Sequence, residues 1–206
     1  MAFQSKTYAR PLVSLALAVA LFFGAQTEVR AGDSAANDRH TVLITGANRG
    51  LGLEFARQYK EAGWRVIGTA RKPGDAEDLE ALGVRLVQLD VADQESVDRM
   101  AAELAGEPID VLINNAGIFP RVGKIEEIDF EDYNRTLEVN TVGPVRVTRA
   151  LLPNLRQGKL KVIAGLSSNL GSIAENERGN FYGYRESKAA LNMFTKTLAA
   201  ELGPEG

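Results

Sequence analysis

Tyr184 and Lys188 are the pair of residues in this sequence best suited to acid–base chemistry. On a helix, residues four apart lie one turn apart on the same face. A tyrosine hydroxyl is a poor base at neutral pH, but a nearby ammonium favours its phenolate form and so eases proton transfer. The spacing Tyr-x-x-x-Lys also occurs by chance, and a plain amphipathic helix would account for it. Tyr182 has no lysine four residues later and is not a candidate.

A hydroxyl-rich segment, Ser167-Ser168-Asn169, follows an apolar run that reads as a strand. Residues that follow the strands of a parallel sheet lie at its carboxyl edge, where such folds bind ligands. A hydroxyl there can hydrogen-bond a substrate oxygen and stabilise charge that develops on it. A simple turn formed by Ser and Asn is the alternative.

A glycine-rich loop, Thr45-Gly46-Ala47-Asn48-Arg49-Gly50-Leu51-Gly52, joins an apolar run to a helical one. Gly46 permits a tight turn, Gly50 lets the backbone approach a pyrophosphate, and Gly52 lets helix and strand pack closely. The first turn of the helix offers unpaired N–H groups to the phosphates. The spacing is G-x-x-x-G-x-G rather than the commoner G-x-G-x-x-G, and an ordinary turn is the alternative. Its place between a buried strand and a helix favours dinucleotide binding. The residues expected to bind the cofactor here are Gly46, Asn48, Arg49, Gly50, Leu51 and Gly52.

The charges that follow the second expected strand bear on the choice between NAD and NADP. That strand ends Thr69-Ala70-Arg71-Lys72, with no carboxylate before Asp75. A carboxylate at this point would take a ribose hydroxyl and repel a 2′-phosphate, whereas Arg71 can bind a phosphate bidentately. Arg49 is expected to lie nearby. Two solvated surface arginines are the alternative, but the pattern favours NADPH over NADH.

These residues need a framework, and apolar runs alternate with helical patterns along the chain. Repeated strand–helix–strand units with short connections predict an α/β fold, a doubly wound parallel sheet of the Rossmann type. Strands are expected at 40–45, 65–69, 84–89, 110–113 and 159–166, and helices at 51–62, 94–105, 130–156 and 182–202.

Composition narrows the classes of function. With 206 residues the chain fits one domain, and a net charge of −3 gives no reason to expect nucleic acid as a partner. The absence of cysteine excludes disulfides and thiolate catalysis, and with a single histidine, His40, a zinc or other metal site is not expected. His40 reads as the start of a surface strand rather than as a catalytic group.

The N-terminus has the order of a secretory signal peptide. Lys6 and Arg10 precede an apolar stretch from 11 to 25, and Val29-Arg30-Ala31 supplies small residues at a plausible cleavage point. The apolar stretch is shorter than the roughly 20 residues of a membrane-spanning helix, which makes an uncleaved anchor the second choice. We expect a signal peptide or anchor over 1–31, a linker over 32–39, and export of the remainder.

Taken together, the motifs resemble those of the short-chain dehydrogenase/reductase family. The glycine loop, Asn114-Asn115-Ala116-Gly117, Asn140, Ser168 and the Tyr184/Lys188 pair occur in the family's order and rough spacing, over residues 41–202. The run Tyr-Arg-Glu-Ser-Lys-Ala-Ala-Leu-Asn, with Gly-Ser-Ile-Ala upstream, is most similar to the branch of C-factor-like and sniffer-type carbonyl reductases.

The resemblance implies a role for each matching residue. Tyr184 would be the acid/base, and Lys188 would bind the nicotinamide ribose and tune the tyrosine. Ser168, three residues before Gly171, would orient the carbonyl. The remaining roles are a water link from Lys188 to solvent for Asn140, adenine contacts for Asp90 and Val91, and for Asn115 a place in the cofactor cleft that also braces the central strands.

The function expected from this resemblance is NADPH-dependent reduction of a small-molecule carbonyl, or the reverse oxidation of an alcohol. The alternatives are a catalytically inactive NADP(H)-binding regulator and a truncated pseudoenzyme. Family members continue with a sixth strand, a substrate flap and a seventh strand, so we expect the Rossmann domain at 40–206 to be incomplete and to fold poorly alone. Family members often pair through the helices that correspond to 130–156 and 182–202, whereas carbonyl reductases of this branch can be monomers, so the resemblance leaves both a homo-oligomer and a monomer open.

Overall fold

The computed structural model describes residues 39–205 apart from 121–122. The expected signal peptide at 1–31 and nearly all of the linker lie outside the described residues, so export stays a prediction. Over the described ranges, no helix has the length and apolar character needed to cross a membrane.

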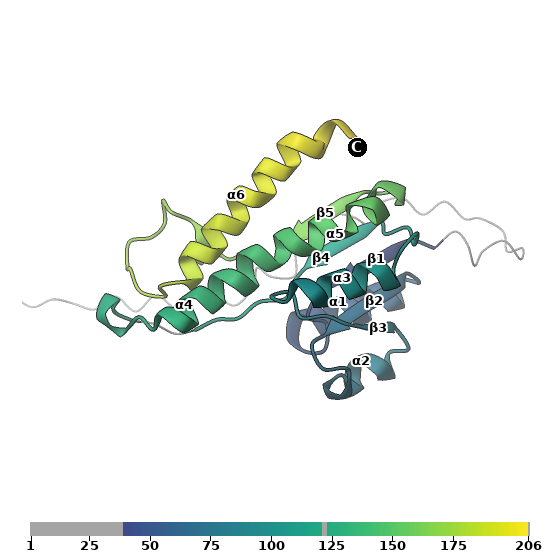
Figure 1. Cartoon of the computed structure of the whole chain (residues 1–206), viewed down its shortest axis with the longest axis horizontal. Helices are drawn as coiled ribbons and strands as arrows, with labels where there is room; N and C mark the ends of the chain where they lie inside the picture. The colour runs from purple at the N-terminus through teal and green to yellow at the C-terminus, as the bar shows by residue number, and fades with distance from the viewer. Residues whose placement is uncertain (1–38, 121–122, 206) are drawn as a thin grey trace, which may run out of the picture. The chain divides into compact units, whose positions relative to one another are not determined.

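The core of the fold is a five-stranded sheet in which every pair of neighbours is parallel. Its order is β3-β2-β1-β4-β5, so the direction of strand addition reverses between β1 and β4 (Figure 1). Such a reversal opens a crevice at the carboxyl ends of the strands. The strands are β1 (Thr41–Ile44), β2 (Arg65–Ala70), β3 (Arg85–Gln88), β4 (Val111–Asn114) and β5 (Val162–Gly165).

Helices cover both faces of this sheet, and each face has its own apolar cluster. One cluster joins Leu43 and Leu112 of the central strands to Met100, Val147 and Leu151 of two helices. The other joins strand residues of the opposite face to α1 and α2. The helices are α1 (Gly50–Glu61), α2 (Glu77–Ala81), α3 (Gln94–Glu103), α4 (Phe130–Leu137), α5 (Gly143–Gln157) and α6 (Tyr184–Leu202). The predicted doubly wound α/β fold is therefore confirmed.

The structure departs from the expected elements at several points. The helix expected at 130–156 is interrupted by a π-helical turn, Glu138–Val142, between α4 and α5. The last helix begins at Tyr184 rather than at 182, because Gly183 precedes it in the left-handed region with a φ of 77°. The fifth strand is shorter than 159–166, because Lys161 has a φ of 52°, which is incompatible with a strand. The short helix α2 was not expected.

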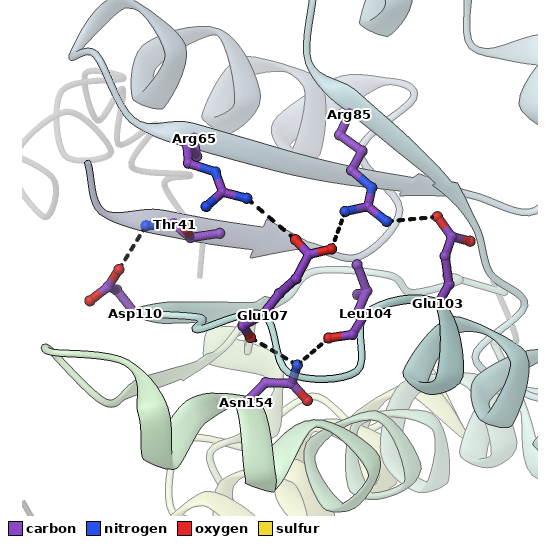
Figure 2. Close-up of polar contacts among 8 residues, drawn as sticks. All are labelled: Thr41, Arg65, Arg85, Glu103, Leu104, Glu107, Asp110 and Asn154. Carbon is purple, nitrogen blue, oxygen red and sulfur yellow. Dashed lines mark hydrogen bonds and ion pairs between the residues drawn. The ribbon is translucent and has the colours of Figure 1, made fainter. Parts of the chain in front are cut away.

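The amino ends of the strands are tied together by a polar network (Figure 2). Glu107, in the turn after α3, pairs with Arg65 at the start of β2 and Arg85 at the start of β3. The side-chain amide of Asn154 donates to the carbonyls of Leu104 and Glu107, at 2.6 and 2.9 Å. These contacts hold the amino ends of the strands in place, at the edge of the sheet opposite the crevice.

Candidate active site

A cleft of about 940 Å³ lies at the carboxyl ends of the strands. Its lining comes from the loop after β1, the segments after β2, β3 and β4, helix α3, and α4 with the turn that follows it. Of the residues expected to bind a cofactor, those that line it are Gly46, Asn48, Arg49, Gly50, Leu51, Arg71, Asp90, Val91 and Asn115.

The glycine loop has the geometry of a phosphate cradle. Gly50 has a φ of 57°, and a Cβ added there would meet nothing within 4 Å, so the space above it is open. The first turn of α1 contains no acidic residue, and no side chain caps its N–H groups. Gly52 does not line the cleft but is buried beneath the loop. A Cβ at this position would overlap the carbonyl oxygen of Gly46, so only glycine fits there. The loop therefore fits the pyrophosphate of a dinucleotide.

Asn115 and Thr45 connect this loop to the segment that follows β4. The Asn115 side chain donates to the carbonyls of Thr45 and Gly46, at 2.8 and 3.0 Å. The Thr45 hydroxyl accepts from the backbone N–H groups of Asn115 and Ala116, both at 3.0 Å. The geometry agrees with the bracing expected for Asn115, whereas Thr45 was not singled out in the sequence. Its signal was weak, since a threonine before a glycine loop is also an ordinary strand residue.

The lining of the cleft holds more cations than carboxylates. The cations are Arg49, Arg71, Lys72, Arg99 and Arg135, and the carboxylates are Asp75, Asp90 and Asp93. Asp75 is drawn close because the Asn48 amide donates to its backbone carbonyl, at 3.5 Å. The excess of cations over carboxylates suits an anionic ligand.

Tyr184 and Lys188, which were expected to contact the cofactor, do not line this cleft; they lie beside it, next to the lining residue Gly117. Lys188 is 5% exposed, and its Nζ donates to the carbonyl of Leu166 at 2.8 Å. The same Nζ lies 5.6 Å from the centroid of the Tyr184 ring. Burial lowers the pKa of the Lys188 ammonium. Gly117, which lines the cleft, connects the two regions: a Cβ there would lie 3.8 Å from Nζ.

The π-helical turn holds Asn140 against the same helix. The Asn140 side chain accepts from the N–H of Ile118 at 2.8 Å and donates to its carbonyl at 2.9 Å. It also donates to the Ser187 hydroxyl, at 3.1 Å, which in turn donates to the carbonyl of Tyr184, at 2.7 Å. The side chain therefore braces α6 beside the tyrosine, and the expected water link stays a prediction. Ser187 was missed because one serine on a helix carries no signal of its own.

The two serines after β5 differ in their partners. The Ser167 hydroxyl donates to the side-chain oxygen of Asn192 on α6, at 2.6 Å. The Ser168 hydroxyl accepts from the N–H of Leu170, at 3.2 Å. Gly171 packs closely against Lys188, because a Cβ added to Gly171 would lie only 2.8 Å from the Cβ of the lysine. The strand end that carries the serines is thus packed onto the helix that carries the Tyr184/Lys188 pair.

Aromatic rings border the tyrosine. Phe119, after β4, meets the Tyr184 ring edge to face with centroids 4.4 Å apart, and it is 46% exposed. Phe181 lies 5.4 Å from Phe119. Phe181 and Asn180 both have a φ of 56°, a strained conformation for a residue other than glycine. Neither phenylalanine was anticipated, because nothing in the sequence pattern places them beside Tyr184.

This arrangement suits proton transfer at the end of a bound dinucleotide. The glycine loop and the cations of the cleft can hold phosphates, and a phenol with a buried ammonium lies beside the cleft next to Gly117. In the described part of the chain, no group of three His, Cys, Asp or Glu side chains could hold a metal ion.

Comparison with known proteins shows which family has this fold and these motifs. A family model described as short chain dehydrogenase matches residues 40–206. C-signal of Myxococcus xanthus is 46% identical over 106 residues, which cover 52% of this chain and 64% of that protein. The NADPH-bound carbonyl reductase from chicken fatty liver has a TM-score of 0.74 and 32% identity, covering 82% of this chain and 76% of the other. The carbonyl reductase Sniffer of D. melanogaster has a TM-score of 0.74 and 33% identity, covering 81% and 77%.

The chain thus spans 64% of the length of C-signal. The match of the family model to residues 40–206 takes in the sheet, the cleft and the Tyr184/Lys188 pair. The chain belongs to the short-chain dehydrogenase/reductase family, whose members are NAD(P)-dependent oxidoreductases.

Proposed function

We propose that the chain is an NADPH-dependent carbonyl reductase that acts on a small-molecule carbonyl compound and, in reverse, on the corresponding alcohol. The observation that carries the proposal is the Tyr184/Lys188 pair, which lies next to Gly117, a residue that lines the dinucleotide-sized cleft. The similarity of the chain to two solved carbonyl reductases, one of them NADPH-bound, supports the same reaction.

In the proposed reaction the cofactor supplies a hydride to the carbonyl carbon. The Tyr184 hydroxyl donates a proton to the carbonyl oxygen, which becomes the alcohol. The Ser168 hydroxyl hydrogen-bonds that oxygen and orients it. The Lys188 ammonium stabilises the phenolate left on Tyr184, and Asn140 with Ser187 keeps α6 in place.

The preference for NADPH over NADH rests on charge. Arg49, Arg71 and Lys72 can bind a 2′-phosphate, and the guanidinium groups can do so bidentately. Asp75 is the nearby carboxylate that could compete by binding a ribose hydroxyl. The cationic majority favours the phosphorylated cofactor.

The rings of Phe119 and Phe181 favour a substrate with an apolar substituent. They lie beside the phenol that would protonate the carbonyl oxygen, and nearly half of Phe119 is exposed. Packing an apolar substituent against these rings would remove apolar surface from water and so strengthen substrate binding.

Replacing Tyr184 by Phe tests the proposed chemistry. The variant removes only the hydroxyl that donates the proton, so we expect turnover of an aromatic aldehyde to fall by about 10³-fold. The dissociation constant for NADPH, measured by titrating its fluorescence, should not change. Tyr182→Phe is the matched control, since that hydroxyl has no assigned role.

Two results would count against the proposal. Unchanged turnover in Tyr184→Phe would remove the tyrosine from the mechanism. A wild-type protein that binds NADPH but reduces no carbonyl compound would favour the inactive NADP(H)-binding regulator.

A further inference from the structure

Arg135 lies at the rim of the cleft on α4, apart from the cations near the glycine loop. Its Nη2 is 3.5 Å from the Oδ2 of Asp90, and both residues line the cleft. The Arg135 side chain is 43% exposed and that of Asp90 33%. The ion pair therefore joins α4 to the segment after β3 where ligand and solvent can both reach it.

Asp90 has supports that do not involve Arg135. Its backbone N–H donates to the Ser96 hydroxyl, at 3.0 Å, and its Oδ1 accepts from the N–H of Ala92, also at 3.0 Å. The carboxylate is thus held by its own turn. The contact with Arg135 is consequently not needed to fold this segment, and Oδ2 keeps a lone pair for a second donor.

The surroundings of this pair suit a flat, partly apolar ring. Val91 and Val139, each 6% exposed, line the same part of the cleft, as does Ile118. A planar ring lying on these side chains would have the Asp90 carboxylate at its edge and the Arg135 guanidinium nearby. A guanidinium is planar and delocalised and stacks well on aromatic faces.

We propose that Arg135 is a cofactor-binding residue that covers the adenine ring of the dinucleotide. In this role its guanidinium stacks on the ring, and Asp90 accepts a hydrogen bond from the exocyclic amine. The inference rests on the proposed use of a nicotinamide dinucleotide. Because adenine is common to NADPH and NADH, Arg135 should strengthen the binding of both by the same factor, unlike the cations near the glycine loop.

Cofactor titration with the full chain separates these roles without any need for turnover. The dissociation constants of NADPH and NADH are measured by fluorescence, and that of 2′,5′-ADP by calorimetry. Arg135→Ala should raise the dissociation constants of all three ligands by about tenfold. Arg71→Ala should weaken NADPH and 2′,5′-ADP while leaving NADH unchanged. Arg135→Lys, which keeps the charge without the planar group, should recover only a small part of the loss.

Arg99→Ala is the matched control for charge. Arg99 also lines the cleft, and it makes only long ion pairs, at 3.8 Å, to Asp93 and Glu95. This variant changes the net charge by the same amount as Arg135→Ala and should leave the three dissociation constants within about twofold of wild type.

The outcomes distinguish the inference from the function on which it rests. If wild-type protein binds neither dinucleotide, the proposed function fails, and the inference fails with it. If wild type binds but Arg135→Ala binds equally well, only the inference is overturned. It is also overturned if Arg99→Ala causes the same loss, or if Arg135→Lys fully restores binding, since either result would reduce the effect to simple charge.

Discussion

Lys188 keeps an ammonium group in an almost fully buried position, with the carbonyl of Leu166 as its hydrogen-bond acceptor. Burial lowers its pKa from the ordinary value of 10.5, so the folded state holds this proton less readily than the unfolded chain does. The charge therefore destabilises the fold at neutral pH. We infer that the residue is retained for chemistry beside Tyr184 rather than for stability.

Replacing Lys188 by Met should raise the free energy of unfolding by about 1 kcal/mol at pH 7 while abolishing turnover. The gain should shrink as the pH rises toward 10.5, because wild type loses its buried charge over that range. Urea denaturation at several pH values measures both effects. Lys196→Met, at an exposed position of the same helix, should change stability little. A Lys188→Met variant less stable than wild type at pH 7 would contradict the argument.

At the scale of elements, Asp110 joins three segments at the amino end of β4. Its carboxylate accepts from the backbone N–H groups of Thr41 at 2.7 Å, Lys159 at 2.8 Å and Leu160 at 3.3 Å, and its Oδ1 is 3.2 Å from Nδ1 of His40 (Figure 2 shows the bond to Thr41). Burial raises the pKa of the Asp110 carboxyl, but these hydrogen bonds outweigh burial and leave the pKa below 3.8. His40 thus supports a strand end, as its sequence position suggested.

Asp110→Asn should lower the free energy of unfolding by about 2 to 3 kcal/mol at pH 7, because an amide N–H₂ replaces one acceptor of buried N–H groups. A carboxyl with a lowered pKa stabilises the fold fully above its unfolded pKa, near 3.8, and loses this contribution as the pH falls through the folded value. Wild type should therefore lose stability below pH 4 more steeply than the variant. Parallel acid dependence of the two proteins in thermal unfolding would refute this assignment.

The elements themselves could largely be predicted, because buried parallel strands are apolar runs and helices between them have regular spacing. The glycine loop and the Tyr184/Lys188 pair follow from local spacing for the same reason. The π-helical turn could not be predicted, since it depends on the contacts of Asn140 with Ile118 and Ser187, which lie far apart in sequence. The positions of Phe119 and Arg135 likewise depend on how β4 and α4 meet the rest of the fold.

At the scale of the whole molecule, the site is assembled from every part of the sheet. The glycine loop follows β1, Arg71 follows β2, Asp90 follows β3, Asn115 follows β4, and Tyr184 opens the helix after β5. Parallel strands bring all these segments to one edge, and the reversal of order between β1 and β4 opens the space between them. The cleft therefore requires the sheet to be assembled before any cofactor can bind.

Cleavage of residues 1–31 is a prediction about the whole chain that mass spectrometry can test. When the protein is expressed in an export-competent bacterial host, the intact mass should correspond to a chain that begins near Gly32. Ala31→Phe should block cleavage, because signal peptidase sites require a small residue there. Full-length protein in the membrane fraction would instead support the N-terminal anchor.

The π-helical turn between α4 and α5 absorbs one additional residue without changing the phase of the helix on either side. A π turn holds one residue more than an α-helical turn, so removing a residue from Glu138–Val142 would restore a regular helix. Val147 and Leu151 would then stay in the apolar cluster on the sheet. The deletion would instead remove the bulge that carries Asn140 and its contacts with Ile118 and Ser187. One additional residue thus lets a single helix both pack on the sheet and hold an amide against α6.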